Sequence, residues 1–450
     1  MGGNQSKPKK HRHHKKHRHH THDDNNDLYH HALENNNGNN NLEFIHFQHL
    51  PENDMSIYRH ETNARPHFTI KSSPEIAKSK AAPASTPAGY SSAQFVQAYG
   101  LNTITGNPTG AGVIIAIVDA YGYPNAASDL SNYCSQYNLT TPNVLTDNSN
   151  VATNQNNLLA NPPSGKFNLL IHKMSSNLQN NSGWAIEQAL DIQIAHAVAP
   201  HAAMILVQAN SSSNADLYSA IAYAKSVGAS VISCSWGMAD SSSSVGDTTF
   251  NAFSGAFTVS AGDSIGVEYP SSNPNVLAVG GTSLVVGGSS GHYTRSSETA
   301  WYNNSSSATG GGTSSYQVTG NQTALPFKFR HVPDVAMLAD PNHGVAVYDT
   351  YGYSGWLEVG GTSVAAPMFA GVLALANQLR LNNSKTVLTD AKIKAFLYSY
   401  TNNTSNASSY FYDITSGGSG ENIATVGYDL MTGYGSPLNG TLVTALAALP

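Results

Sequence analysis

Charged side chains are scarce in this chain of 450 residues. Asp, Glu, Lys and Arg make up 11% of it, against about 25% in an average globular protein. Seven of the 22 Lys and Arg fall in residues 1–22, which hold no acid, and this leaves 15 basic against 28 acidic residues, a formal charge of -13. Residues 23–450 therefore gain little net positive charge when their carboxylates protonate, which favours tolerance of low pH. It is not expected to bind nucleic acid.

Cysteine is nearly absent as well. Only Cys134 and Cys234 occur, so a disulfide framework is excluded and two buried free thiols are expected. No run is long and apolar enough to predict a transmembrane helix. The chain also begins without the apolar stretch of a secretory signal peptide. Residues 88–450 are numerous enough to bury one large core, and we expect a single domain that acts as a monomer.

Residues 1–87 predict a disordered N-terminal extension. Gly2, with Ser6 four positions on, fits the pattern for N-myristoylation, and the Lys and Arg cluster of residues 7–18 would add a second signal for contact with an anionic membrane. The alternative is an unmodified, solvated tail. Seven histidines between residues 11 and 22 are typical of weak metal binding or of a plain disordered tract. An Asn-rich linker follows, with room for a short propeptide.

From residue 88 onward, apolar strand-like runs alternate with helical patterns. Residues 113–119 are an apolar run that ends in Asp119, which is typical of a buried parallel strand. The alternation predicts an α/β fold with a mostly parallel central sheet flanked by helices, and functional residues at the strand C-terminal ends. Further strands are expected at residues 167–172, 203–208, 229–235 and 258–261, and helices at 92–99, 125–137, 184–198 and 215–227.

One stretch is built to expose a serine. Residues 360–367 form a small-residue turn that delivers Ser363 to the start of a helical apolar run, where the helix N-terminus favours a developing anion. The same four letters, Gly-Gly-Thr-Ser, end at Ser283, but there a strand-like run follows, so we interpret Ser283 as structural. The local pattern alone leaves open whether Ser363 is a nucleophile or part of a buried turn.

Three acids complete the pattern. Glu187 and Asp191 lie four residues apart and hence on one face of a helix that is otherwise apolar, which raises the pKa of at least one of them. A solvated face is the alternative, and the surrounding Ala, Ile and Leu argue against it. Asp263 follows an apolar strand in a tight turn, where it either caps the turn or, when neutral, donates a hydrogen bond to an oxyanion.

Taken together, these spaced motifs in residues 86–450 resemble the sedolisins, the serine-carboxyl peptidases of acidic environments. The resemblance implies a subtilisin-like three-layer fold. It also implies a role for each residue: Ser363 as nucleophile, Glu187 as general base, Asp191 as the acid that orients Glu187, Asp263 as oxyanion donor, and Asp119 and Trp236 beside the hydrogen-bond network of the glutamate.

The chemistry of these residues agrees with the resemblance. Below about pH 6 a histidine is already protonated and cannot accept a proton from serine, whereas a carboxylate with a pKa near 4 can. The chain also lacks the His-Gly-Thr-His-type motif of a Ser/His/Asp subtilisin. We therefore expect an acid-active serine-type endopeptidase that hydrolyses proteins or peptides through an acyl-enzyme. The alternative is a catalytically silent, membrane-tethered binding module.

Residues near the chain end resemble the calcium site of the same family. The resemblance implies one calcium ion, and Gly/Asp-rich turns without metal are the alternative. The implied ligands are the side chains of Asp413 and Asp429 with the carbonyls of Ile414, Thr425 and Gly427, and Thr425 stands where the family often has glycine.

The cellular location stays open between the cytoplasm, a membrane surface and an acidic or extracellular location.

Overall fold

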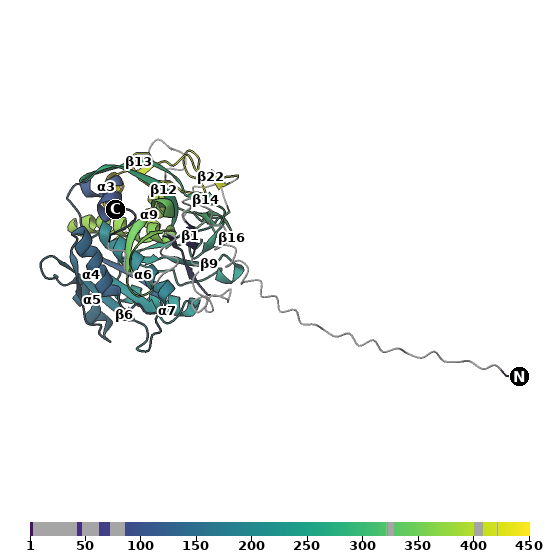
Figure 1. The fold of residues 1–450 in the computed structure, drawn as a ribbon, viewed down its shortest axis with the longest axis horizontal. Helices are drawn as coiled ribbons and strands as arrows, with labels where there is room; N and C mark the ends of the chain where they lie inside the picture. The colour runs from purple at the N-terminus through teal and green to yellow at the C-terminus, as the bar shows by residue number, and fades with distance from the viewer. Residues whose placement is uncertain are drawn as a thin grey trace. The chain divides into compact units, whose positions relative to one another are not determined.

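The described part of the chain comes from a computed structural model. It comprises residues 1–2, 43–46, 63–72, 86–320, 322, 328–399, 408–420 and 422–450. The chain divides into two units, residues 1–42 and residues 43–450, and the architecture below belongs to the second (Figure 1).

A nine-stranded sheet forms the centre of this unit. All of its strand pairings are parallel except that of β12 with β13, which confirms the predicted, mostly parallel sheet. The order is β13 (His292–Ala300), β12 (Leu277–Ser289), β10 (Ala256–Ser260), β8 (Val231–Cys234), β4 (Ile114–Ala120), β7 (Ala203–Ala209), β6 (Lys166–Lys173) and β5 (Thr141–Val144), and β18 (Val335–Leu338) also pairs with β12.

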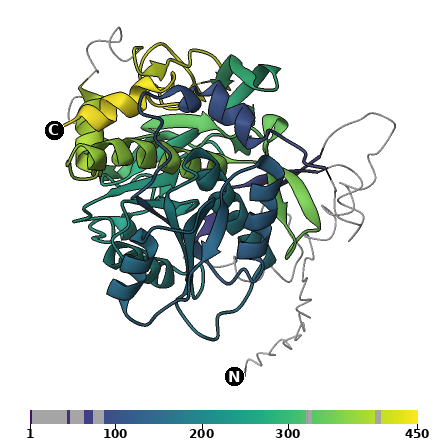
Figure 2. The same ribbon diagram turned by 90° about the vertical axis from the view of Figure 1, so that its left-hand side faces the viewer.

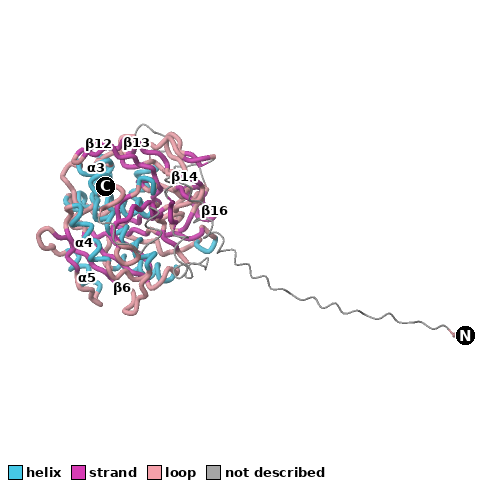
Figure 3. Tube along the Cα trace, viewed as in Figure 1, coloured by secondary structure: helices cyan, strands magenta, loops and turns pink. Residues whose placement is uncertain are grey.

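Helices cover both faces of the sheet, as strand β4 illustrates. Its Ile115 and Ile117 belong to one apolar core and its Ile114 and Val118 to another, because successive side chains of a strand point to opposite faces. The first core includes α3 (Ser92–Ala98), α4 (Ala126–Tyr137), α6 (Ser182–Val198) and α8 (Thr362–Asn382), and the second includes residues of α5 (Val151–Leu159) and α7 (Asn214–Ser226). The three-layer α/β fold is therefore confirmed, and Figure 3 distinguishes its helices from its strands.

Smaller elements surround these layers. They are β1 (Glu43–His46), β2 (Arg65–Pro66), β3 (Thr69–Ser72), β9 (Trp236–Ala239), β11 (Glu268–Tyr269), β14 (Tyr302–Asn304), β15 (Ser307–Ala308), β16 (Gly312–Val318), β17 (Phe329–Val332), β19 (Val345–Asp349), β20 (Gly355–Gly360), β21 (Phe411–Tyr412), β22 (Gly418–Ser419), β23 (Asn422–Ile423), β24 (Ser436–Pro437), α9 (Asp390–Tyr398) and α11 (Thr441–Ala448), with single 3-10 turns at Leu101–Thr103, Ser242–Ser244 and Pro341–His343.

Helix α8 corrects one expectation. By length and composition it could cross a membrane, although no such run was predicted from the sequence. Its most apolar window is 83% buried inside the fold, and α11 packs against it (Figure 2). Its apolar character is therefore that of a core helix, which is hydrophobic on all sides because it is covered on all sides.

Part of the predicted disordered extension is ordered. Strand β2 pairs with β9, and strand β3 pairs with β20 and β1. Residues 63–72 are thus built into the same unit as the central sheet. The domain boundary at residue 87 stays a prediction, and the rest of the extension, apart from residues 1–2, 43–46 and 86–87, lies outside the described residues.

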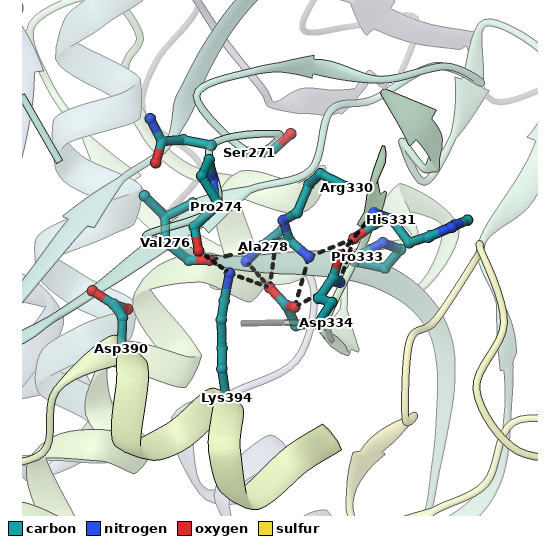
Figure 4. A network of polar contacts seen from close by, with 12 residues as sticks. Ser271, Pro274, Val276, Ala278, Arg330, His331, Pro333, Asp334, Asp390 and Lys394 are labelled. Atoms are coloured by element: carbon teal, nitrogen blue, oxygen red, sulfur yellow. Dashed lines mark hydrogen bonds and ion pairs between the residues drawn. The ribbon is translucent and has the colours of Figure 1, made fainter. Parts of the chain in front are cut away.

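A buried ion pair ties the segment after β17 to the sheet. Arg330 donates to both carboxylate oxygens of Asp334, at 2.8 and 2.5 Å, and Asp334 also accepts from the amide of Ala278 in β12. Lys394 reaches from α9 toward this pair and donates to the carbonyl of Pro274 at 2.8 Å (Figure 4). Burial lowers the pKa of Lys394 to about 7, so Arg330 is the firmer of the two counter-charges.

Replacing Arg330 should therefore destabilise the fold. Arg330→Ala leaves Asp334 buried with an incomplete counter-charge, which we expect to lower the free energy of unfolding by about 3–5 kcal/mol. Urea unfolding monitored by tryptophan fluorescence measures this, in a Ser363→Ala background that prevents self-digestion. Lys173→Ala, at an exposed site, is the control and should change stability by less than about 0.5 kcal/mol. Equal stability of the two variants would contradict the prediction.

Candidate active site

Ser363 lies in the first turn of α8. Gly361 precedes the helix with a φ of 108°, in the region that favours glycine, and so allows the sharp turn out of β20. The Ser363 side chain is buried, and its Oγ donates to the carbonyl of Ser235 at 3.2 Å. Its amide belongs to the first turn of α8, where backbone N–H groups have no partner within the helix and negative charge is favoured.

Glu187 and Asp191 lie one turn apart on α6, and both are completely buried. The expectation of an apolar rather than a solvated helix face is thus met. Asp191 accepts a hydrogen bond from the hydroxyl of Ser235 at 2.8 Å. The same Ser235 therefore contacts Ser363 through its carbonyl and Asp191 through its side chain.

Asp119, near the C-terminal end of β4, adds a third buried carboxyl group. Both oxygens of Asp119 and of Glu187, and one oxygen of Asp191, receive no hydrogen bond of standard geometry among the described residues. Buried carboxylates without donors are costly, so the three groups cannot all be charged. We infer that they share protons and titrate as one set.

The pKa shifts of this set have one main cause. Burial raises the pKa of Asp119 to about 8. Burial, followed by the charges of Asp191 and Asp119, raises the pKa of Glu187. The Ser363 hydroxyl opposes that rise, so it lies close enough to act on Glu187 although its well-aligned hydrogen bond goes to Ser235.

Asp263 occupies the turn after β10 and faces α8. Its Oδ1 accepts from the amide and the hydroxyl of Thr362, at 2.8 and 2.9 Å, whereas its buried Oδ2 has no hydrogen bond. Burial raises the pKa of Asp263 to about 6. Below that pH its Oδ2 carries a proton and can donate it in a hydrogen bond.

The backbone carbonyl of His67 lies beside both Ser363 and Asp263. The amide of Ser363 donates to the carbonyl of His67 at 2.9 Å. A Cβ placed on Gly361 would lie 2.3 Å from that carbonyl oxygen and 2.5 Å from Oδ2 of Asp263, so the two oxygens face the same point. The arrangement resembles an oxyanion hole, with one amide and one protonated carboxyl group as donors.

Comparison with known proteins agrees with this geometry. The Subtilase family matches residues 112–435. Kumamolisin from Bacillus sp. (strain MN-32) is 30% identical over 425 residues, which cover 85% of this chain and 68% of that protein. The chain belongs to the sedolisin family. Sedolisin from Pseudomonas sp. (strain 101) is 27% identical over 414 residues, 83% of this chain and 64% of that protein.

A solved structure supports the same assignment. Pseudomonas sedolisin, described as a serine-carboxyl proteinase complexed with two molecules of pseudo-iodotyrostatin, matches with a TM-score of 0.63 and 26% identity, over 80% of this chain and 98% of that one. The present chain is thus a serine-carboxyl peptidase with a subtilisin-like α/β fold, and its relatives are peptidases, which act on proteins or peptides. The comparisons lend no support to the silent, membrane-tethered alternative.

Trp236 lies beside Asp119, and its role in the hydrogen-bond network of the glutamate stays a prediction. Its indole N–H donates to the backbone carbonyl of Val118 at 2.9 Å. It therefore holds β9 against the end of β4, next to Asp119. Ser283 lies in β12 and donates to Asp340 at 2.7 Å, in keeping with a structural role, and both cysteines are free and buried.

Four residues that contact the active-site groups are not predicted by any motif of the sequence. Neither Ser235, which precedes Trp236, nor Thr362, which precedes Ser363, is a candidate from the sequence. Ser260 and Glu268 were missed, because neither stands in a recognisable motif, yet both contact His67 beside the nucleophile. A carboxylate five residues after the Asp263 turn was the one available hint.

Hydrogen bonds join two pairs of residues of the predicted calcium site, and the site itself stays a prediction. The carboxylate of Asp413 accepts from the amide of Gly427 at 3.0 and 3.1 Å, and that of Asp429 accepts from the amide of Thr425 at 3.0 Å. Burial raises the pKa of Asp413, and raises that of Asp429 to about 6. Among the described residues no three His, Cys, Asp or Glu side chains form a metal cluster, so any site here depends on backbone carbonyls as well.

The N-terminal predictions remain untested. Gly2 is exposed. The basic cluster, the histidines of residues 11–22 and most of the linker lie outside the described residues, so acylation, membrane contact and metal binding by the tract stay predictions.

Proposed function

We propose that this sedolisin hydrolyses peptide bonds at acidic pH, with Ser363 as nucleophile and Glu187 as general base. The observation that carries the proposal is the meeting of Ser363, its amide and the unpartnered Oδ2 of Asp263 around a single peptide carbonyl. The buried acids of α6 and β4 supply a base that works where histidine is already protonated.

The expected protonation states of the three buried acids support Glu187 as the general base. Among the described residues no hydroxyl group opposes the rise in the pKa of Asp119, unlike those of Glu187 and Asp191, so we assign Asp119 as the neutral acid. The Ser235 hydroxyl bonded to Asp191 and the nearby Ser363 hydroxyl both favour negative charge on the Glu187 and Asp191 pair. A small rotation of the Ser363 hydroxyl from the Ser235 carbonyl to Glu187 then allows proton transfer as Oγ attacks. Asp191 orients Glu187 in this scheme.

The tetrahedral intermediate would be stabilised by two donors. The Ser363 amide is charge-neutral and available at every pH. Asp263 donates only while it is protonated, and with a pKa of about 6 it does so in acid. The proposed oxyanion donor therefore favours an acidic optimum.

We also propose that one calcium ion binds the loop of Asp413, Ile414, Thr425, Gly427 and Asp429. The donor set fits a hard cation, because it consists of oxygen atoms only. The raised pKa values of Asp413 and Asp429 also fit, since two partly buried carboxylates that pair with no Lys or Arg of the described residues gain from a cation. The ion would stabilise the loop, and no step of the reaction depends on it.

Replacing Ser363, with Ser283 as the matched control, tests the identity of the nucleophile. Ser363→Ala should lower kcat/KM for a denatured protein by about 10⁴-fold or more, and Glu187→Gln by a similar factor, since both act in one proton transfer. Hydrolysis is measured between pH 3 and 8. Ser283→Ala changes the same Gly-Thr-Ser letters and should stay within twofold of the parent. Unchanged activity of Ser363→Ala would refute the proposal.

The variant Asp263→Asn tests the role of Asp263 as an oxyanion donor. In the parent, activity should fall as pH rises through about 6, because Asp263 then loses the proton that it donates. Asp263→Asn retains the acceptor for Thr362 and carries a donor at every pH, so the alkaline limb should move upward by at least one pH unit. The measurement is kcat/KM against pH. An alkaline limb that stays at the same pH would assign it to another group.

Calcium is tested by thermal unfolding of the Ser363→Ala protein. After chelation, adding calcium at about 100 times its Kd should raise Tm by about 2–6 °C, because a ligand of the folded state stabilises it by mass action. Asp413→Asn should abolish most of this shift. Asp147→Asn, remote from this loop in sequence and hydrogen-bonded to His172 instead, should retain it. Equal shifts in both variants would remove the site from this loop.

A further inference from the structure

Two buried glutamines lie beside the proposed catalytic acids and have no part in the chemistry assigned above. Gln188 follows Glu187 on α6, and Gln208 lies in β7. Both side chains are completely buried. A buried amide needs acceptors for its nitrogen and donors for its oxygen, so its orientation follows from its partners.

The end of β4 fixes the orientation of Gln188. The side-chain nitrogen of Gln188 donates to the backbone carbonyls of Ala120 and Tyr121, at 3.0 and 3.2 Å. A carbonyl oxygen can only accept, so the amide atom that faces these two carbonyls is the nitrogen. The amide oxygen of Gln188 is therefore the atom that is left for a donor.

The orientation of Gln208 follows from that of Gln188. Its Nε2 donates to Oε1 of Gln188 at 2.7 Å. Reversing the amide of Gln208 would place two oxygen atoms against each other, so its own Oε1 is left as an acceptor. This oxygen is buried and receives no hydrogen bond of standard geometry from the described residues. Such an acceptor is stabilised if a neighbouring group offers it a proton.

Asp119 is the neighbour that can offer this proton. The register of β4 and β7 places Asp119 directly opposite Gln208. Ile117 and Leu206 stand two residues before them in the two strands, and both belong to the first core, which includes α6. Asp119 and Gln208 therefore point to the same face, under α6, from strands that are about 4.8 Å apart.

The other acids leave a proton on Asp119 without an acceptor. Hydrogen bonds from Ser235 and, in looser geometry, with Glu187 oppose the rise in the pKa of Asp191. Asp119 acts on Glu187 and Asp191 through its charge alone. The thiol of Cys234 is the further titratable group that responds to this charge, and burial raises its pKa, so it stays neutral.

The indole N–H of Trp184, near the start of α6, is a rival donor for Gln208. It too is buried and makes no hydrogen bond of standard geometry with the described residues. Trp184 packs in the second core, however, together with Ala120 and Ala209. These alanines follow Asp119 and Gln208 in their strands, so their side chains point to the opposite face of the sheet.

We propose that Gln208, oriented by Gln188, is a positioning residue of the active site whose Oε1 accepts a hydrogen bond from the protonated carboxyl group of Asp119. The negative charge of the acid set is then confined to Glu187 and Asp191. The inference rests on the proposed function, because that function gives the charge its use. Gln208 touches no reacting atom and acts through Asp119.

The amide distinguishes between the two protonation states of Asp119. Oε1 gains a hydrogen bond when Asp119 is neutral and faces a negatively charged oxygen when Asp119 is ionised, so it favours the neutral form. If the charge moved from Glu187 to Asp119, the proton would move to Glu187. Glu187 could then no longer accept the proton of Ser363.

Infrared spectroscopy of the full-length Ser363→Ala protein at pH 5 tests this hydrogen bond. The C=O stretch of a protonated carboxyl group is assigned to Asp119 by its loss in Asp119→Asn. Gln208→Met keeps the side-chain length but has no amide oxygen, so the band should move to higher wavenumber. A band that stays in place in Gln208→Met would overturn the proposal, and so would the lack of any band that Asp119→Asn removes.

Gln193→Met is the matched control. Gln193 is also buried on α6, but its amide pairs with the backbone of Tyr348 at 2.8 and 2.9 Å. Its replacement should leave the Asp119 band where it is in the Ser363→Ala protein. Trp184→Phe should leave the band in place as well. A shift in Gln193→Met as large as that in Gln208→Met would mean that repacking moves the band, and would contradict the proposal.

The pH profile in the active enzyme gives a readout that a purely structural role would not change. Gln208→Met should lower kcat by about tenfold, for the loss of one buried hydrogen bond, and leave KM unchanged. Gln208→Glu can donate to Gln188 and accept from Asp119 only while its new carboxyl group is protonated. Its kcat relative to the parent should therefore be close to one at pH 4 and fall as pH rises.

The Gln208→Glu profile also guards against misfolding of Gln208→Met, because it is judged against the parent alone. A ratio to the parent that does not change with pH would overturn the proposal. If hydrolysis through Ser363 occurs but the infrared band does not respond to Gln208, the inference is wrong and the proposed function stands. If the band responds but no hydrolysis occurs between pH 3 and 8, the proposed function is wrong and the Asp119–Gln208 hydrogen bond stands.

Discussion

Three carboxyl groups that are buried together, with no basic partner in the described part of the chain, are the constraint on which this active site depends. Asp119, Glu187 and Asp191 come from a strand and a helix of the core, and their burial forces them to share protons. A histidine base in the same position would be charged throughout the acidic range. A proton-sharing set of acids can instead lose one proton in acid and accept one from serine. The position of α6 against the sheet is therefore as important to the chemistry as the residues themselves.

The second constraint is the turn at Gly361, which brings two segments to one point. No side chain fits there, since a Cβ would lie within 2.5 Å of both the His67 carbonyl oxygen and Oδ2 of Asp263. The missing side chain allows α8 to present its first amides to a peptide carbonyl from one side while Asp263 approaches from the other. Thr362 then fixes the orientation of Asp263 through two hydrogen bonds. The nucleophile and its oxyanion donors are thus positioned by the same turn.

The sequence predicted the sheet, the helices and the motif residues of this site better than the strand of residues 63–72 that lies across it. Apolar runs and their order were enough for the parallel sheet, and α6 and α7 begin and end within two residues of the expected bounds. Glu187, Asp191, Asp263 and Ser363 could be named because each stands in a motif. Residues 63–72 could not, because a polar, unpatterned segment gains its strand structure only from pairing with β9 and β20, which lie far away in the sequence. Glu268 was missed for the same reason, since its role depends on a partner 201 residues earlier.

The bound strand also changes the electrostatics of the site that binds it. The charge of His67 lowers the pKa of Asp263, opposing the larger effect of burial, and it is the leading cause that holds Glu268 ionised. His67 and Arg65 are the two cations that stabilise the negative charge of Glu268, and both belong to residues 63–72. Without them, burial at this position would raise the pKa of Glu268, and without His67 the pKa of Asp263 would rise as well. The strand that crosses the site therefore lowers the pH up to which Asp263 stays protonated and able to donate a hydrogen bond.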